Sequence, residues 1–378
     1  MKRWGWVWNT AVLVTGAAAL AWYLWREHAR DAAAWARIQE RAEHFEREQP
    51  RGPQPRRPLR GPARPGEAGA CYLRAAELLH KVWPDYESMQ PFLDVAHGTG
   101  VPEDADALLA PLLPALAAVA DGAASETVAP PDPQRWVEFG LSWGPLGSAG
   151  KFAVRAALAK GDARAALGHT AAFLGLAFDE STFGISLCEL LFAFLVGTML
   201  EPWTEERLRA VAPEQLHELA ALLAELDARC APSLPLATVH AEFVWAWRDS
   251  RSDAPVRGMG EHQLSGQLAF LEFLDGAEAR TATGWTAREN LLRRAVKQCE
   301  VESPPDWLAM ETYRRRAIAS LRLLRLAVLH HAGEPLPALA DPLGDGDLEV
   351  VRAEGELLLR SRGSRDDGQR IERRIARR

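Results

Sequence analysis

The chain has 378 residues, of which 48% are apolar and 25% are charged, as in an ordinary globular protein of one large domain or two smaller ones. Residues 1–66 hold 12 basic and 6 acidic residues, a net charge of +6, which leaves 32 and 45, a net of −13, for the remainder. Because phosphate repels so acidic a body, we expect no nucleic-acid partner.

The N-terminal segment 4–25 holds 22 residues and no charge. As a helix rising about 1.5 Å per residue, it would cross a hydrocarbon core of roughly 30 Å. Aromatic residues mark both ends: Trp4, Trp6, Trp8 and Trp22, Tyr23, Trp25. We therefore predict a transmembrane anchor over residues 1–25, with the lipid bilayer as its partner. The alternative is a signal peptide cleaved after Ala19-Leu20-Ala21.

Basic residues lie on both sides of the predicted span, so their balance only weakly sets its orientation. A very short leading tail followed by a large domain is typical of a signal-anchor. We expect a single-pass protein of the bacterial cytoplasmic (inner) membrane with its soluble domain outside the cytoplasm.

Two segments connect the predicted anchor to the body. Residues 26–49 read as a juxtamembrane helix whose stripe faces a partner helix, its own domain or lipid; the stripe is Trp35, Ile38, Ala42 and Phe45. Residues 50–66 contain six prolines and five arginines, which predicts an extended polyproline II linker. We interpret it as a solvated basic spacer; contact with acidic headgroups is the alternative.

Residues 67–340 predict a helical domain. Tyr72, Ala76 and Leu79 share one helical face, whereas Pro111 and Pro114 should kink or break a later helix. Gly161-Asp162 separates two alanine-rich helices, which predicts a tight αα-hairpin that allows close helix packing.

The apolar segment 183–200 carries one charge, Glu189, which favours a core helix over a second membrane span. Leucines at helical spacing follow in 213–229, and Val239, Phe243 and Trp247 share a stripe in the next helix. The last long helix begins near the prolines at 304 and 305 and ends at Gly333.

We find no named catalytic motif and assign no catalytic, cofactor-binding or metal-binding residue. His240 and Glu242, with Arg248 and Asp249, could line the groove of a hydrolase, although a core histidine and surface ion pairs explain them more simply. His330-His331 fits the macrodipole of a helix C-terminus better than a metal pair.

Other polar residues favour structural roles. The arginines of the last helix predict internal salt bridges; they are Arg314, Arg315, Arg316, Arg322 and Arg325. The cysteines lie far apart in sequence and predict buried thiols; they are Cys71, Cys188, Cys230 and Cys299. If the domain lies outside the cytoplasm, one or two disulfides are the alternative.

Residues 341–369 predict a C-terminal β-hairpin docked on the last helix. Asp341-Pro342 with Gly344 and Gly346 predicts a turn, and two β-prone runs flank residues 353–355. Val350 and Leu358 would share one face. Residues 370–378 predict a frayed basic tail.

This tail resembles the C-terminal region of type II secretion pseudopilins, in which a D-P-x-G turn, short strands and an S-x-G-x-D-G loop close the domain. Ser361, Gly363, Asp366 and Gly368 approximate that loop. In major pseudopilins the loop can hold calcium, but only Asp366 and Asp367 would serve here, so we assign no calcium site. The absence of a glutamate at Thr10 and the long helical insert depart from the pilin pattern.

A wider resemblance covers most of the chain. It is similar to membrane-anchored bacterial proteins of planctomycete and myxobacterial type, on the helix "GEAGACYLRAAELL", the tetratricopeptide-like "GD" helix pair at 161–162 and the D-P tail with "DDG". The resemblance implies architecture and no activity.

The sequence therefore predicts a mainly α protein with an N-terminal transmembrane helix, an αα-hairpin body and a small C-terminal β-hairpin. The predicted function is a membrane-anchored interaction or scaffold protein, and the sequence does not favour an enzyme. The alternatives are an accessory component of a secretion or pilus-like envelope assembly and a hydrolase at His240 and Glu242.

Overall fold

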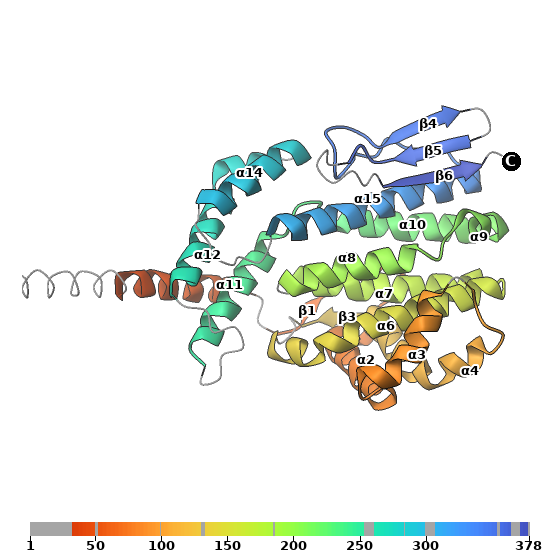
Figure 1. Ribbon diagram of the computed structural model, residues 1–378, viewed down its shortest axis with the longest axis horizontal. Coiled ribbons are helices and arrows are strands. Elements are labelled where there is room, and N and C mark those ends of the chain that lie inside the picture. The colour runs from red at the N-terminus through yellow and green to blue at the C-terminus, as the bar shows by residue number, and fades with distance from the viewer. Residues whose placement is uncertain are drawn as a thin grey trace, which may run out of the picture.

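The computed structural model describes residues 32–49, 52–98, 100–129, 133–183, 186–252, 261–282, 284–298, 307–353, 356–363 and 371–376. The predicted anchor over residues 1–25 lies outside them. Within the described residues the chain is mainly helical and carries two small three-stranded sheets (Figure 1). This confirms the predicted mainly α class with β structure near the C-terminus, whereas the first of the two sheets was not predicted.

The first half of the chain contains β1 (Gln54–Pro55), β2 (Arg64–Glu67), α2 (Ala68–Val82), α3 (Tyr86–His97), α4 (Ala105–Leu109), η1 (Ala110–Leu112), α5 (Leu113–Ala124), β3 (Ser125–Val128), α6 (Pro133–Ala159) and α7 (Ala163–Phe183). The second half contains α8 (Ser186–Leu200), α9 (Glu205–Ala210), α10 (Pro213–Arg229), α11 (Leu236–Ser250), α12 (Glu261–Leu274), α13 (Ala277–Thr281), α14 (Trp285–Gln298), α15 (Trp307–Ala332), β4 (Glu349–Ala353), β5 (Glu356–Arg360) and β6 (Glu372–Ala376). A helix over residues 32–48 precedes them all.

Helices α2 to α10 and the C-terminal part of α15 enclose the larger apolar core, which we call the bundle. Gly161 adopts a φ of 75° between α6 and α7, which confirms the predicted αα-hairpin. Small residues bring these helices close, since a Cβ on Gly150 would lie 2.5 Å from the ring of Phe173. Pro111 and Pro114 divide the region into α4, η1 and α5, as predicted.

Helix α8 lies in the bundle between α6 and α15 (Figure 1). Glu189 is fully buried and its Oε2 accepts a hydrogen bond from Nη1 of Arg314 at 2.7 Å. The partner explains how a charge is tolerated in this apolar helix and supports the predicted core position.

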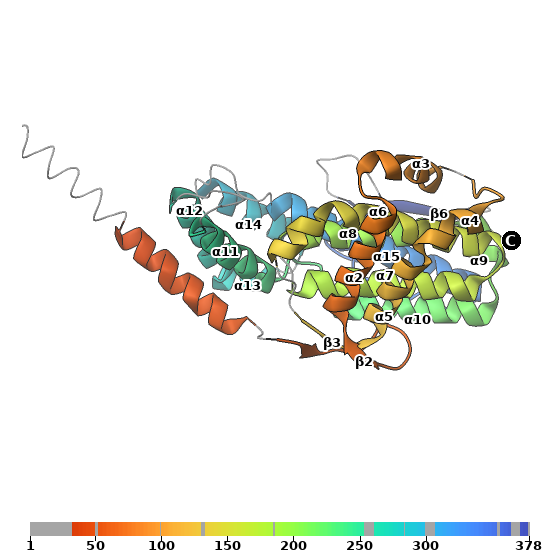
Figure 2. The ribbon, with the colours of Figure 1, turned by 90° about the horizontal axis from the view of Figure 1, so that it is seen from below.

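A second apolar core, which we call the N-terminal module, joins the helix over 32–48 to α11, α12, α14 and the first turns of α15. Ile38, Ala42 and Phe45 are at most 2% exposed within it. The stripe predicted on the juxtamembrane helix therefore packs on the protein itself. Figure 2 shows this helix lying obliquely against one end of the molecule.

Residues 52–67 form a segment that we call the strap. The expectation of a solvated spacer holds for it only in part, because residues 61–66 are exposed whereas Pro58 and Leu59 are buried. β1 pairs antiparallel with β3 and β2 pairs parallel with it, so β3 is the central strand. Leu59 is buried in the bundle, and Glu67 caps α2 by accepting from the backbone N of Gly69 and Ala70 at 2.7 Å. Proline prevents helix but leaves short edge strands possible, and β3 supplies their partner.

The C-terminal sheet has the order β4-β5-β6 and packs on α15 through Leu357, Leu359 and Ile375. Docking on the last helix is confirmed, but the frayed tail is wrong, because residues 372–376 form the third strand. The predicted pairing is also shifted, since Val350 lies opposite Leu359 and not Leu358.

One stretch of the described residues, Ala105–Ala124, is long and apolar enough to cross a membrane by length and composition. Its α5 part packs against α2 and α7 within the bundle.

Candidate interaction surface

His240 and Glu242, the residues of the hydrolase hypothesis, lie in different surroundings. The His240 ring stacks on Phe45, with centroids 4.0 Å apart, and its Nε2 lies 3.9 Å from Oδ2 of Asp275. Burial lowers the pKa of His240, which favours the neutral imidazole. Glu242 is fully buried. A side chain without solvent access cannot meet a substrate in this conformation, so the geometry does not favour a hydrolase.

Arg314, Arg315, Arg322 and Arg325 form internal ion pairs as predicted for α15, buried at the first two positions and partly exposed at the last two. Arg314 binds Glu189, and Arg315 donates to Glu311 at 3.0 Å. Arg322 and Arg325 both face Asp227, at 2.7 and 3.8 Å.

Glu311 also accepts from Nε of Arg288 on α14, at 3.1 Å, and from the backbone N of Leu234 at 3.3 Å. These contacts occur between the two apolar cores, so we call Glu189, Arg288, Glu311, Arg314 and Arg315 the polar joint. Each charge in it is satisfied by an opposite one, which buried ions require.

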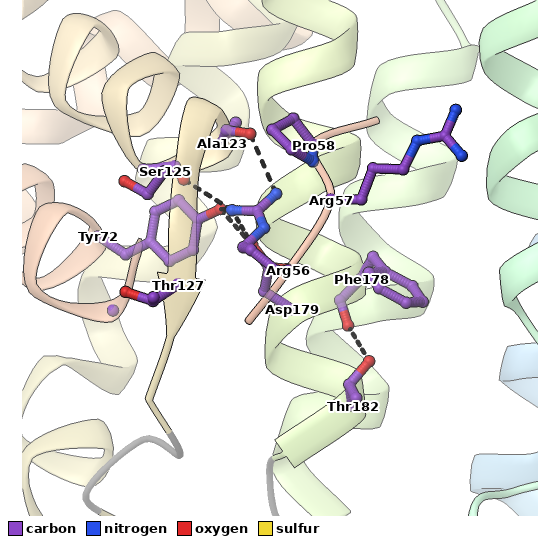
Figure 3. Close-up of polar contacts among 12 residues, drawn as sticks. Arg56, Arg57, Pro58, Tyr72, Ala123, Ser125, Thr127, Phe178, Asp179 and Thr182 are labelled. Carbon is purple, nitrogen blue, oxygen red and sulfur yellow. Dashed lines mark hydrogen bonds and ion pairs between the residues drawn. The ribbon is translucent and has the colours of Figure 1, made fainter. Parts of the chain in front are cut away.

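A second buried cluster fastens the strap to the bundle (Figure 3). Arg56 lies 2.8 Å from Oδ2 of Asp179 and donates to the backbone O of Gly122 and Ala123. The hydroxyl of Tyr72 donates to the same carboxylate oxygen at 2.6 Å. Burial raises the pKa of Asp179 to about 6, although Arg56 and Tyr72 both lower it. The side chains of Arg56, Tyr72 and Asp179 are all buried, so we infer that the cluster attaches the strap to the bundle.

Asp341 performs a similar structural task at the base of the C-terminal sheet. Its carboxylate accepts from the backbone N of Leu343 at 3.0 Å, from Oγ of Ser361 at 2.7 Å and from the backbone N of Arg362 at 2.5 Å. Ser361, which the pseudopilin resemblance placed in a calcium loop, thus binds Asp341. Asp366, Asp367 and Gly368 lie outside the described residues.

The remaining residues singled out from the sequence also have protein partners or buried positions. Nε2 of His331 lies 2.6 Å from Oε2 of Glu205, at the end of α15. Cys188 and Cys230 are buried, and burial raises the pKa of Cys230 to about 12. Cys299 lies outside the described residues. No group of three or more metal-ligating side chains occurs within the part of the chain that the structure describes.

An open apolar groove lies between α8 and α15 and has a volume of about 380 Å³. Its lining consists of Leu190, Ala193, Phe194 and Gly197 from α8 and Tyr313, Arg316, Ala317 and Ser320 from α15. Leu190, Phe194 and Tyr313 keep 37%, 39% and 46% of their surface exposed. A cluster of large exposed apolar side chains is typical of a binding surface.

The groove is already shaped for contact. A Cβ on Gly147 of α6 would lie 2.6 Å from the ring of Phe194, so this ring rests directly on the glycine backbone. Ala193, Gly197, Ala317 and Ser320 provide small side chains between the larger ones. The sequence does not predict this surface, because the apolar residues 183–200 favour a helix buried on all sides. The spacing of Leu190 and Phe194, one helical turn apart, was the available signal.

Comparison of the chain with protein-family models, with curated proteins and with solved structures gives no match. The resemblances named above therefore stay predictions, and functional inference rests on the geometry of the chain.

Proposed function

We propose that this protein is a single-pass membrane-anchored interaction protein, whose groove between α8 and α15 binds an amphipathic helix of a protein partner. The observation that carries the proposal is the meeting of three exposed large apolar side chains, from two neighbouring helices, around small ones.

The spacing of the lining residues supports a helical partner. Residues 190, 193, 194 and 197 on α8 have the i, i+3, i+4, i+7 pattern, and residues 313, 316, 317 and 320 on α15 repeat it. Two such stripes side by side can receive the apolar face of a third helix. The groove extends over about two turns of each helix. Stable interfaces bury about 800 Å² per partner, so this length fits one helix better than the globular face of a second copy.

Two observations support the anchored arrangement. The uncharged segment 4–25 has the length and the aromatic ends of a membrane span. The helix that follows it packs through Ile38, Ala42 and Phe45 on the N-terminal module. In this proposal the body is held at the membrane outside the cytoplasm, and the strap joins that helix to the bundle.

A photoreactive phenylalanine analogue at position 194 of the full chain, expressed in bacterial membranes, tests the groove. We expect a crosslinked protein partner at position 194 and none from the same analogue at Leu113, which is 53% exposed elsewhere on the body. Phe194→Glu should weaken recovery of that partner at least tenfold, whereas Leu113→Glu should not. Equal recovery from both positions would refute the groove.

Extraction of membranes at alkaline pH tests the anchor. The full chain should stay with the membrane, and a chain that begins at residue 26 should be released. Release of the full chain would refute anchoring and leave the groove to be judged by its own experiment.

A further inference from the structure

We propose that the outer edge of β4 is a second docking site, which receives an extended peptide segment by strand addition, with an acidic side chain near Arg352. This site is independent of the groove, which receives a helix.

The outer backbone N–H and C=O groups of β4 have no strand partner among the described residues. β4 pairs with β5 on one side, and no other strand among the described residues pairs with it. An antiparallel pair uses about half of a strand's backbone donors and acceptors, and the other half points away. Apart from the ladder with β5, no backbone hydrogen bond between described residues involves Val350, Val351 or Arg352. In Figure 1, β4 is the strand of its sheet farthest from α15.

The two valines in the middle of β4 do not protect this edge. Val350 and Val351 are adjacent, point to opposite faces of the sheet and remain 38% and 39% exposed. Proteins usually protect exposed edges with charged residues, proline or a covering element. Here two β-branched apolar residues, which favour further strand pairing, occupy the middle of the edge.

The opposite edge of the same sheet shows such protection. On β6, Glu372 pairs with Arg374 at 3.0 Å, and Nη1 of Arg373 donates to the backbone O of Trp203 at 2.9 Å. Arg209 on α9 donates to the backbone O of Ala376 at 3.5 Å. The outer edge of β6 thus carries charged side chains and a contact from α9, whereas the middle of β4 carries two exposed valines.

The edge is also held in place before any partner binds. Leu357 and Leu359 fix β5 on the bundle, and Arg360 and Arg362 both pair with Glu349 at the start of β4. A strand that is already straight loses little conformational entropy when another strand joins it.

Charge indicates the partner's chemistry. Arg360 and Arg362 neutralise Glu349, whereas Arg352 is exposed and has no ion pair with any described residue. A carboxylate on the incoming strand, opposite or diagonal to Arg352, would supply the missing charge, as cross-strand pairs do in sheets.

Binding of synthetic peptides to the full chain in mild detergent tests the proposal. The probe is a short fluorescent peptide of alternating valine and threonine with one central glutamate, and binding is read by anisotropy. We expect saturable binding that weakens at least fivefold when the glutamate is replaced by lysine. N-methylation of the backbone amides on one edge of the peptide should abolish binding, which contact through side chains alone would not predict.

Variants of the protein complete the test. Val351→Lys should reduce binding at least tenfold, and Val351→Thr, which keeps the branched shape, should retain it. Arg352→Glu should reverse the preference between glutamate and lysine peptides. Equal binding by Val351→Lys, equal binding of the N-methylated peptide, or no binding of any peptide would overturn the proposal. Dimerisation of the chain alone that Val351→Lys abolishes would overturn it too, because the occupant would then be a second copy.

Discussion

The bundle and the N-terminal module solve the same packing problem with different residues. In the bundle, alanine and glycine allow α6 and α7 to pack closely, and Arg56 attaches the strap to α7 by pairing with Asp179. The module relies on large aromatic side chains, among them Phe45, Phe243 and Trp307. Between them lies the polar joint, in which Glu189 of α8 pairs with Arg314 of α15 and Arg288 of α14 pairs with Glu311 of α15. We expect this joint to fix how the two cores meet, since removing one partner of a buried ion pair leaves an uncompensated charge.

Glu311→Ala should have the largest effect, because it leaves Arg288 and Arg315 buried without a carboxylate. We expect a loss of about 3–5 kcal/mol in the free energy of unfolding, measured in urea, with the two cores unfolding separately. Glu278→Ala, which removes the partner of Arg294 in an exposed ion pair, is the control and should cost under about 1 kcal/mol. Similar losses from both variants would show that the joint is not special.

Phe45→Ala should destabilise the N-terminal module by about 3 kcal/mol, because the buried ring contacts His240 and Phe243. Hydrogen exchange should accelerate in α11 and α12 and stay unchanged in α7. Phe194→Ala, which removes a half-exposed ring, should leave both regions protected. Equal acceleration in α7 would mean that the two regions unfold as one.

The stability of the bundle should depend on pH through Asp179, the carboxylate to which Arg56 of the strap binds. Asp179 has a pKa of about 6 in the folded chain against an ordinary value of 3.8. The folded state therefore holds its proton more tightly than the unfolded state. The resulting stabilisation is complete below about pH 4 and is lost as the pH rises through 6, a change of about 3 kcal/mol.

Urea unfolding of the wild type and of Asp179→Asn across this range measures that change. Asparagine does not titrate there, so the difference in stability between the two proteins should shift by about 3 kcal/mol between pH 4 and pH 7.5. Parallel pH profiles would contradict the assignment to Asp179.

Gly161→Ala should have the smallest effect, about 1 kcal/mol of destabilisation, because the residue has a φ of 75° but open space around its Cβ position. Gly197→Ala, also without a neighbour within 4 Å but inside α8, should stabilise by up to about 1 kcal/mol. Thermal unfolding compares them, and equal shifts would contradict the backbone argument.

Local chemistry made much of the fold predictable. Some residues end or divide helices through their own backbone conformation, which can be read from the sequence; they are Gly161, Gly333 and the prolines at 111 and 114. Helical spacing predicts the apolar stripe that contains Ile38 and Phe45, but it does not predict which helices the stripe packs on. Docking of the C-terminal strands followed from the apolar Leu357 and Leu359.

The rest depends on contacts between distant parts of the chain. Arg56 looked like one of several solvated arginines, because Asp179 lies far away in sequence and its burial is a tertiary property. The charged residues around Ile375 predict a solvated tail, whereas in the structure Ile375 is fully buried and its segment forms β6. The spacing of Leu190 and Phe194 indicates a stripe on α8, but not that α15 lies beside it to complete the groove.

The helix over residues 32–48 has a consequence for biosynthesis. Its ion pairs join Arg37 to Glu272 and Glu46 to Arg248, partners separated by 235 and 202 residues. At roughly 5–20 residues per second, the ribosome supplies those partners on the order of 10–50 s after the helix itself. During that interval Ile38, Ala42 and Phe45 have no α11 or α12 to cover them. Whatever shields this stripe while the chain is still growing is as much a requirement of the fold as the packing that later replaces it.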